Sequence, residues 1–183
     1  MRCFIALEVP ADIRSQLASM ITALQAADAD VKWVDPANIH LTLKFLDEIS
    51  QAQMSAVSAQ LDTLRGRYQK IPLLLTKMGA FPDMKRPQTI WAGVEKTTLL
   101  AALFNDLEPL MSTIGLTKEQ RNLKPHLTLG RVRSIRNAHR LTTIIAESRI
   151  ASSQSAFSAL TLFRSTLTPT GPRYQPLMTI GLE

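Results

Sequence analysis

The tetrapeptide His-Leu-Thr-Leu occurs twice in this chain of 183 residues, at positions 40–43 and 126–129. The two copies contain two of the three histidines of the protein. Apolar and polar residues alternate within each copy, which is the period-2 pattern of a β-strand. Because successive strand side chains point to opposite faces, His40 shares a face with Thr42. His126 shares a face with Thr128 in the same way, and the leucines point toward a core.

The stretches around these copies predict an α+β fold. Strand-like runs occupy 3–9, 31–34, 38–46, 71–78, 89–94, 124–132, 156–166 and 174–181, and helical spacing occupies 12–27, 50–66, 98–111 and 137–149. The order strand, helix, motif strand, helix, strand occurs twice. We therefore expect residues 1–183 to form a single bilobal domain. Its two lobes are related by a pseudo-two-fold axis, and each is an antiparallel sheet with outer helices, with a cleft between them.

Three local patterns refine this expectation. Ser50 followed by Gln53 is a capping-box pattern, which predicts the start of a helix. The stretch from Gly79 to Gln88 is rich in Pro and polar residues and is expected to be a loop. Pro109 is expected to kink or end the helix that begins at Thr98.

Composition limits the class of protein. The formal net charge of +6 favours an anionic partner such as nucleic acid or a phosphate ester, although basic residues can also serve solubility alone. A single cysteine, Cys3, excludes a disulfide framework, and its apolar neighbours predict a packing role. The N-terminus lacks a signal-peptide pattern, and no apolar run approaches the ~20 residues of a membrane span. We therefore expect a cytoplasmic protein without membrane contact.

Two histidines on opposite walls of a cleft are a minimal set for general acid and general base catalysis. Imidazole has an ordinary pKa near ~6.5, so both of its forms are available near neutral pH. One ring can take a proton from water while the other gives a proton to a leaving alkoxide, as in-line displacement at phosphorus requires. The threonine hydroxyls can donate to phosphate oxygens, or they can be no more than good strand formers. The residue types alone do not say which histidine is the acid.

Other chemistries fit the sequence less well. The histidines are far apart and neither has a second ligand close by, so a metal site is not expected. His139 falls at the start of a predicted helix and is expected to be exposed. Glycine-rich phosphate-binding patterns are absent, which leaves an ATP-driven ligase without support.

Paired His-x-Thr-x motifs in a bilobal α+β arrangement resemble the two-histidine (2H) phosphoesterases. Within them, the chain is most similar to the LigT-like RNA 2′,3′-cyclic phosphodiesterases of bacteria and archaea, also called 2′-5′ RNA ligases. The resemblance runs from 2–10 through 38–46 and 124–131 to Phe163 and Tyr174. The family usually has Gly where this chain has Asp47. A Gly there indicates an unusual backbone angle, which Asp tolerates better than most residues.

The resemblance implies hydrolysis of a 2′,3′-cyclic phosphate to a 2′-phosphomonoester without metal or cofactor. It assigns His40 as proton donor to the departing 3′ oxygen and His126 as proton acceptor from water. Thr42 and Thr128 complete the catalytic set.

The resemblance also implies that Phe45 and Arg131 bind substrate, through the base and the phosphate. Strict strand alternation puts Arg131 on the leucine face. Its role therefore predicts a strand end or a bulge near Gly130.

The implied partner is RNA with a 2′,3′-cyclic phosphate end, or a cyclic nucleotide, and the protein is expected to be a monomer. Reversal of the reaction, with an RNA 5′-hydroxyl in place of water, implies 2′-5′ ligation without ATP. Two alternatives stay open. One is a phosphodiesterase for a small substrate such as ADP-ribose 1″,2″-cyclic phosphate, and the other is an RNA-binding module without catalytic activity.

Overall fold

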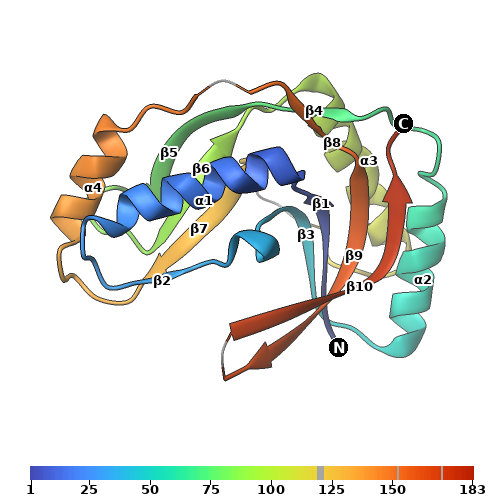
Figure 1. The fold of residues 1–183 in the computed structure, drawn as a ribbon. Coiled ribbons are helices and arrows are strands. Elements are labelled where there is room, and N and C mark those ends of the chain that lie inside the picture. Colours follow the sequence, from blue (N-terminus) through green and yellow to red (C-terminus); the bar gives the residue numbers. More distant parts are fainter. Residues whose placement is uncertain (119–121, 152, 170) are drawn as a thin grey trace.

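The computed structural model describes residues 1–118, 122–151, 153–169 and 171–183 (Figure 1). Within them, two four-stranded antiparallel sheets form the framework. The first sheet has the order β10 (Gly171–Gly181), β9 (Ala159–Thr168), β1 (Arg2–Glu8) and β3 (His40–Glu48). The second has the order β2 (Val31–Trp33), β7 (His126–Val132), β6 (Thr89–Val94) and β5 (Leu75–Phe81). A short pair joins β4 (Ile71–Leu73) to β8 (Ser155–Phe157).

Each sheet draws strands from both halves of the chain. β2 comes from the N-terminal half but pairs with β7 in the second sheet. β9 and β10 return from the C-terminal half to the first sheet, where β9 pairs with β1. The repeated order in the sequence predicted two lobes, and two sheets are present, but they do not coincide with the two sequence halves.

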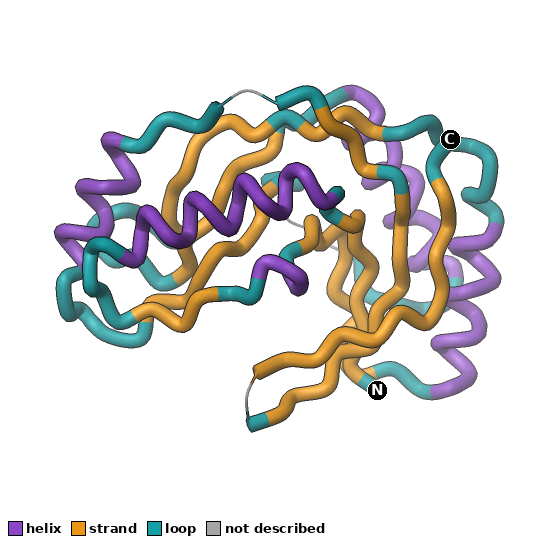
Figure 2. The backbone as a smooth tube through the Cα atoms, in the orientation of Figure 1, coloured by secondary structure: helices purple, strands orange, loops and turns teal. Residues whose placement is uncertain are grey.

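Helices cover the outside of the sheets (Figure 2). α1 (Ala11–Gln25) and α4 (Ala138–Glu147) lie on the side of the second sheet, and α2 (Gln51–Asp62) and α3 (Thr98–Thr113) on the side of the first (Figure 1). A short 3-10 helix, η1 (Pro36–Asn38), leads into β3. None of the helices in the described residues combines the length and the apolar character needed to cross a membrane.

The predicted capping box at the start of α2 is confirmed. Ser50 Oγ accepts from the backbone N–H of Gln53 at 3.2 Å, and Gln53 Oε1 accepts from the backbone N–H of Ser50 at 3.0 Å. These two bonds satisfy amide groups that a helix start otherwise leaves without partners. His139 is exposed near the start of α4, as expected.

One sequence-based expectation is wrong in detail. The residues from Gly79 to Phe81 are strand rather than loop, since β5 pairs with β6 as far as Phe81. Of the two outcomes expected at Pro109, an end of the helix does not occur, since α3 continues to Thr113. A proline removes one helical donor, but buried α3 residues on both sides of Pro109 hold the helix against the core: Leu103, Leu107 and Met111, each 0% exposed.

The two motif strands meet where the sheets join. Their leucines belong to one continuous core and are at most 4% exposed: Leu41, Leu43, Leu127 and Leu129. β3 is the edge strand of the first sheet, and its Cα atoms come within 8 Å of those of β7. The shared core therefore brings the two His-Leu-Thr-Leu copies to the same region of the molecule.

Candidate active site

The backbone holds His40 and His126 in the same way. Nδ1 of His40 lies 2.8 Å from the carbonyl oxygen of Asn38, two residues earlier. Nδ1 of His126 lies 2.7 Å from the carbonyl oxygen of Lys124, again two residues earlier. A carbonyl oxygen only accepts, so each Nδ1 carries a hydrogen and donates it. Each ring therefore has Nε2 as its nitrogen for proton transfer.

Both motif strands contain a β-bulge at the last leucine of the motif. The pairing of β3 with β1 skips Leu43, and the pairing of β7 with β6 skips Leu129. A bulge adds one residue and reverses the alternation beyond it. Phe45 and Arg131, each five positions after its histidine, consequently lie on the face of that histidine and its threonine. The bulge that a substrate contact by Arg131 required is present.

The residue just after each bulge turns to the buried face. Lys44 is 4% exposed there, and its Nζ lies 2.9 Å from Oε2 of Glu108 in α3. It also donates to the carbonyl oxygen of Thr117 at 2.8 Å. Gly130 holds the equivalent place in β7, where an added Cβ would lie 2.6 Å from Cγ1 of Val31. The two motif strands thus have a bulge at the same position, but the residues after the bulge make different buried contacts.

Asp47 has the left-handed backbone conformation that the sequence indicated, with φ of 54°. It follows a second skip in the pairing of β3 with β1, at Leu46. Asp is among the residues that adopt this region most readily. The departure from the usual Gly is therefore compatible with the same backbone turn.

The His40 ring lies in an aromatic cluster supplied by β1, β9 and β10. It stacks on Phe4 with the ring centroids 4.6 Å apart and meets Tyr174 edge-on at 5.1 Å. The ring centroid of Phe163 lies 6.2 Å from that of His40. Burial lowers the pKa of His40, because the charged ring loses hydration, and the bond to the Asn38 carbonyl acts in the opposite direction. The neutral ring is therefore favoured in the free protein.

Phe45 extends this cluster to the surface. Its ring centroid lies 6.4 Å from that of Phe4, the residue directly opposite in β1. Phe45 is nevertheless 66% exposed. A large aromatic face left open beside a histidine can stack on a flat ligand ring.

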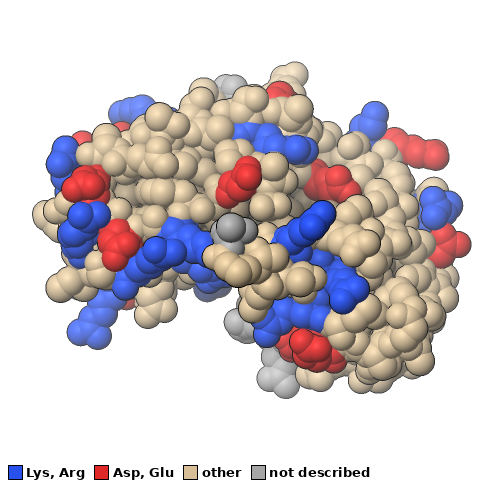
Figure 3. Space-filling model, turned by 60° about the horizontal axis from the view of Figure 1, so that its bottom comes forward, with Lys and Arg blue, Asp and Glu red and all other residues tan. Residues whose placement is uncertain are grey.

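Arg131, in the second sheet, lies close enough to Tyr174 in the first for its charge to act on the tyrosine hydroxyl. Burial raises the pKa of Tyr174 in the first sheet, and the positive charge of Arg131 acts against this rise. The Arg131 charge therefore lies near the ring that contacts His40. Lys32 in β2 pairs with Arg131, so the two side chains lie on the same face of the second sheet. A Cβ built on Gly171 in β10 would lie 3.8 Å from Nζ of Lys32, so this ammonium group also lies close to the first sheet. Figure 3 shows Lys and Arg side chains gathered across the lower middle of one face of the molecule.

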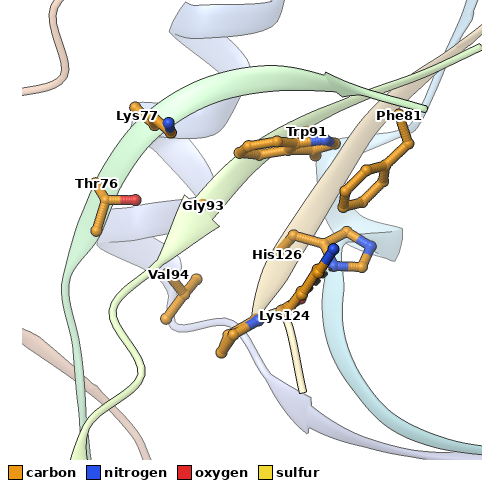
Figure 4. A pocket seen from close by; sticks show the side chains of 9 residues that line it. Thr76, Lys77, Phe81, Trp91, Gly93, Val94, Lys124 and His126 are labelled. Carbon is orange, nitrogen blue, oxygen red and sulfur yellow. Dashed lines mark hydrogen bonds between the residues drawn. The ribbon is translucent and has the colours of Figure 1, made fainter. Parts of the chain in front are cut away.

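His126 borders a cavity of about 190 Å³ on the second sheet (Figure 4). The Phe81 ring meets the His126 ring edge-on, with the ring centroids 4.9 Å apart. The ring centroid of Trp91 lies 5.1 Å from that of Phe81. Lys77 and Lys124 also line the cavity. The surroundings of the two histidines therefore differ, since aromatic rings enclose His40 while His126 opens on a cavity.

Sequence reasoning missed the aromatic neighbours Phe4, Phe81 and Trp91. Strand pairing could have identified them, because Phe4 stands opposite Phe45 and Trp91 stands opposite Thr128. The register between strands that are distant in the chain cannot be obtained from one sequence, so these residues had no local signal.

Cys3 has the packing role expected of it. It is 1% exposed, and burial raises the pKa of its thiol, which opposes use as a nucleophile. Among the described residues, no three side chains of His, Cys, Asp and Glu lie together in a way that could hold a metal ion.

Comparison with known proteins places this chain in a family. A family model described as "LigT like Phosphoesterase" matches residues 7–91 and 94–174, which include both motif strands. A curated relative from Methanothermobacter thermautotrophicus, named RNA 2′,3′-cyclic phosphodiesterase, is 33% identical over 175 residues, covering 94% of each chain. A relative of the same name from Thermotoga maritima is 30% identical over 183 residues, covering 100% of this chain and 96% of its own.

The fold agrees with this relationship. The crystal structure of E. coli LigT in apo form matches with a TM-score of 0.78 and 26% identity, over 99% of this chain and 96% of LigT. The crystal structure of TT0787 from Thermus thermophilus matches with a TM-score of 0.80 and 24% identity, over 100% of this chain and 98% of its own. With paired motifs, matched histidine geometry and a family match over nearly its whole length, the chain belongs to the LigT-like phosphoesterase family.

Proposed function

We propose that the protein hydrolyses the 2′,3′-cyclic phosphodiester at RNA ends to a 2′-phosphomonoester, with His40 as proton donor and His126 as proton acceptor. The observation that carries this proposal is the matched presentation of two imidazole Nε2 atoms, from strands whose Cα atoms approach within 8 Å. The name shared by the curated relatives supports the substrate class.

In hydrolysis, water attacks phosphorus in line with the bond to the 3′ oxygen. Nε2 of His126 takes the proton of the water, and Nε2 of His40 gives a proton to the 3′ oxygen as its bond to phosphorus breaks. The product is a 2′-phosphomonoester with a free 3′-hydroxyl, and the two rings regain their protonation states by exchange with solvent. A positioned proton-transfer group contributes about 10²–10⁴-fold, so each histidine supplies a distinct part of the rate.

Phosphate oxygens gather negative charge in the transition state. Thr42 and Thr128 lie on the histidine faces of their strands, where each hydroxyl can donate to such an oxygen. Arg131 reaches the same face beyond its bulge and carries a permanent positive charge. Preorganised donors and charge at these oxygens favour the transition state over the ground state.

The low pKa of His40 gives the substrate a second role. Burial favours the neutral ring in the free protein, whereas a proton donor must be charged. The cyclic phosphate is an anion, and an adjacent anion stabilises imidazolium. The bound phosphate therefore raises the pKa of His40 and favours its protonated form, so the general acid forms in the enzyme–substrate complex.

The same groups join RNA ends when an RNA 5′-hydroxyl replaces water as the nucleophile. His126 takes the proton of an RNA 5′-hydroxyl, the 5′ oxygen bonds to phosphorus, and His40 protonates the departing 3′ oxygen. The product is a 2′-5′ linkage, and the strained cyclic ester replaces ATP as the source of activation.

The test is turnover of a 2′,3′-cyclic mononucleotide and of an RNA with a cyclic end, each in the presence of a chelator. Turnover with a 2′-phosphate product is the expected result. Absence of turnover on both substrates, with binding retained, would establish an RNA-binding module instead. Loss of turnover to the chelator alone would overturn the two-histidine mechanism.

A third substrate distinguishes the remaining alternative. ADP-ribose 1″,2″-cyclic phosphate offers the same strained ester without an RNA chain. Because basic side chains line the site, we expect the RNA to have the lowest KM and its KM to rise with salt. A lower KM for the ADP-ribose derivative would assign the protein to small cyclic phosphates.

A further inference from the structure

The proposed chemistry does not use the aromatic platform beside His126. This platform is the indole of Trp91, a residue of β6 that stands opposite Thr128 and therefore shares the face of His126. Its outer side borders the cavity of about 190 Å³, together with Phe81, Lys77 and Lys124 (Figure 4).

Two glycines allow the indole to lie flat on the sheet. Gly79 stands opposite Trp91 in β5, and a Cβ added there would lie 2.5 Å from Cζ2 of the indole. A Cβ added to Gly93 would lie 2.6 Å from the hydroxyl of Thr76 and 3.3 Å from Cζ3 of the indole. Any larger residue at Gly79 would force the ring away from the strand. The indole thus lies against the glycine backbone of the sheet, and it also lines the cavity.

The indole also carries a donor without a protein acceptor. Trp91 Nε1 is shielded from solvent and has no hydrogen-bond partner in the part of the chain that the structure describes. A buried donor of this kind costs free energy unless a ligand or water satisfies it. It lies at the end of the ring nearest Phe81 (Figure 4).

Size and charge identify the class of ligand. A cavity of about 190 Å³ is smaller than the ~300–1,000 Å³ of pockets that hold whole drug-sized ligands, so it suits one flat ring system. Aromatic side chains stack on nucleobases without strong sequence preference. The ammonium groups of Lys77 and Lys124 suit the phosphates that flank a base in RNA.

We propose that this cavity is the acceptor subsite, which binds the nucleoside whose 5′-hydroxyl attacks the cyclic phosphate in ligation. The inference rests on the proposed function, because it uses His126 as the base that takes the proton of the attacking hydroxyl. A base stacked on Trp91 places its ribose beside that imidazole. The nucleotide that carries the cyclic phosphate is held on the other sheet, at the aromatic cluster of His40. Water needs no such subsite, so hydrolysis and ligation differ in their use of Trp91.

Activity measurements separate the two reactions. Trp91→Leu is expected to leave kcat/KM for a 2′,3′-cyclic mononucleotide within about threefold and to raise the KM for a 5′-hydroxyl RNA acceptor by about 5–150-fold, the range of one lost base stack. Trp33→Leu is the matched control, since Trp33 pairs with Gly130 and lies on the opposite face of the same sheet. Equal loss of both reactions in Trp91→Leu, with unchanged thermal unfolding, would overturn the subsite.

Fluorescence tests the subsite without any turnover. The chain has two tryptophans, so Trp33→Phe leaves Trp91 as the sole emitter. Adenosine 3′-monophosphate, which has a free 5′-hydroxyl, is expected to quench this emission with saturation, and to leave the Trp91→Phe protein unchanged. An unquenched Trp33→Phe protein would overturn the acceptor subsite even if cyclic nucleotides are hydrolysed. Saturable quenching in a protein that hydrolyses no cyclic phosphate would contradict the proposed function and leave a nucleoside-binding site at Trp91 without its acceptor role.

Discussion

β3 and β7 carry the same tetrapeptide in two different environments. In both strands Nδ1 of the histidine donates to the carbonyl two residues earlier, and in both a bulge falls at the last leucine. Beyond the bulge they differ, with Lys44 and Phe45 in β3 against Gly130 and Arg131 in β7. The backbone therefore repeats the position of the reacting nitrogen, while the neighbouring strands give each copy its own surroundings.

The difference separates the two imidazoles chemically. His40 stacks on Phe4 and meets Tyr174 edge-on, and burial lowers its pKa, whereas His126 faces a cavity lined by two lysines. An acid and a base must hold their protons differently in the same cycle, so two identical sites would be a poor pair. The repeated motif supplies the common backbone geometry, and the different adjacent strands supply the asymmetry.

The largest effect is expected from removing either imidazole. His40→Ala and His126→Ala should each lower turnover of a 2′,3′-cyclic nucleotide by about 10²–10⁴-fold, since each deletes one proton transfer. The double variant should lose less than the product of the two single losses, because groups that act as a unit are not additive. Steady-state kinetics with a chelator present measures all three.

His139 provides the control for these variants. It is the remaining histidine of the chain and is exposed on α4. His139→Ala should match the wild type in turnover. Near-wild-type turnover in His40→Ala or His126→Ala would show that one copy of the motif is only structural.

The buried faces of the two strands differ in what they add to stability. Lys44→Met removes the ammonium that contacts the buried Glu108 carboxylate at 2.9 Å, which should lower the free energy of unfolding by up to about 3–5 kcal/mol. Chemical denaturation measures this loss. Replacing Glu108 by Leu in the same protein should recover part of it, because the buried carboxylate is then removed as well. A single variant as stable as the wild type would mean that the buried pair contributes nothing to the fold.

The threonines should contribute less than the histidines. Thr42→Ala and Thr128→Ala each remove a neutral donor to a charged phosphate, which corresponds to about 1–3 kcal/mol of transition-state stabilisation. The expected loss in kcat/KM is about 5–150-fold for each. Thr→Ser at the same positions keeps the hydroxyl and should retain most of the activity. If the serine and alanine variants lose equally, the threonines serve strand packing rather than the phosphate.

The sequence predicted the repeated strand features and missed the contacts that depend on pairing between distant strands. Period-2 alternation identified the strands, the buried leucines and the shared face of each histidine and threonine. It put Arg131 on the wrong face until a bulge was assumed, because a one-residue bulge is set by pairing with β6, not by local pattern. The platform at Trp91 and the ring of Phe4 depend on register between distant strands, which one sequence does not contain.

The smallest expected effect is a shift in pH dependence that assigns the acid. If His40 is the proton donor, activity is lost as pH rises through its pKa. Burial lowers that pKa in the free protein, and the substrate anion raises it in the complex. The alkaline limb of kcat/KM, which reports the free enzyme, should therefore lie at lower pH than the alkaline limb of kcat, which reports the complex. In His40→Ala the residual activity should lose the alkaline limb and keep the acid limb, with the reverse in His126→Ala. An acid limb lost in His40→Ala would exchange the two roles and make the aromatic cluster the environment of the base.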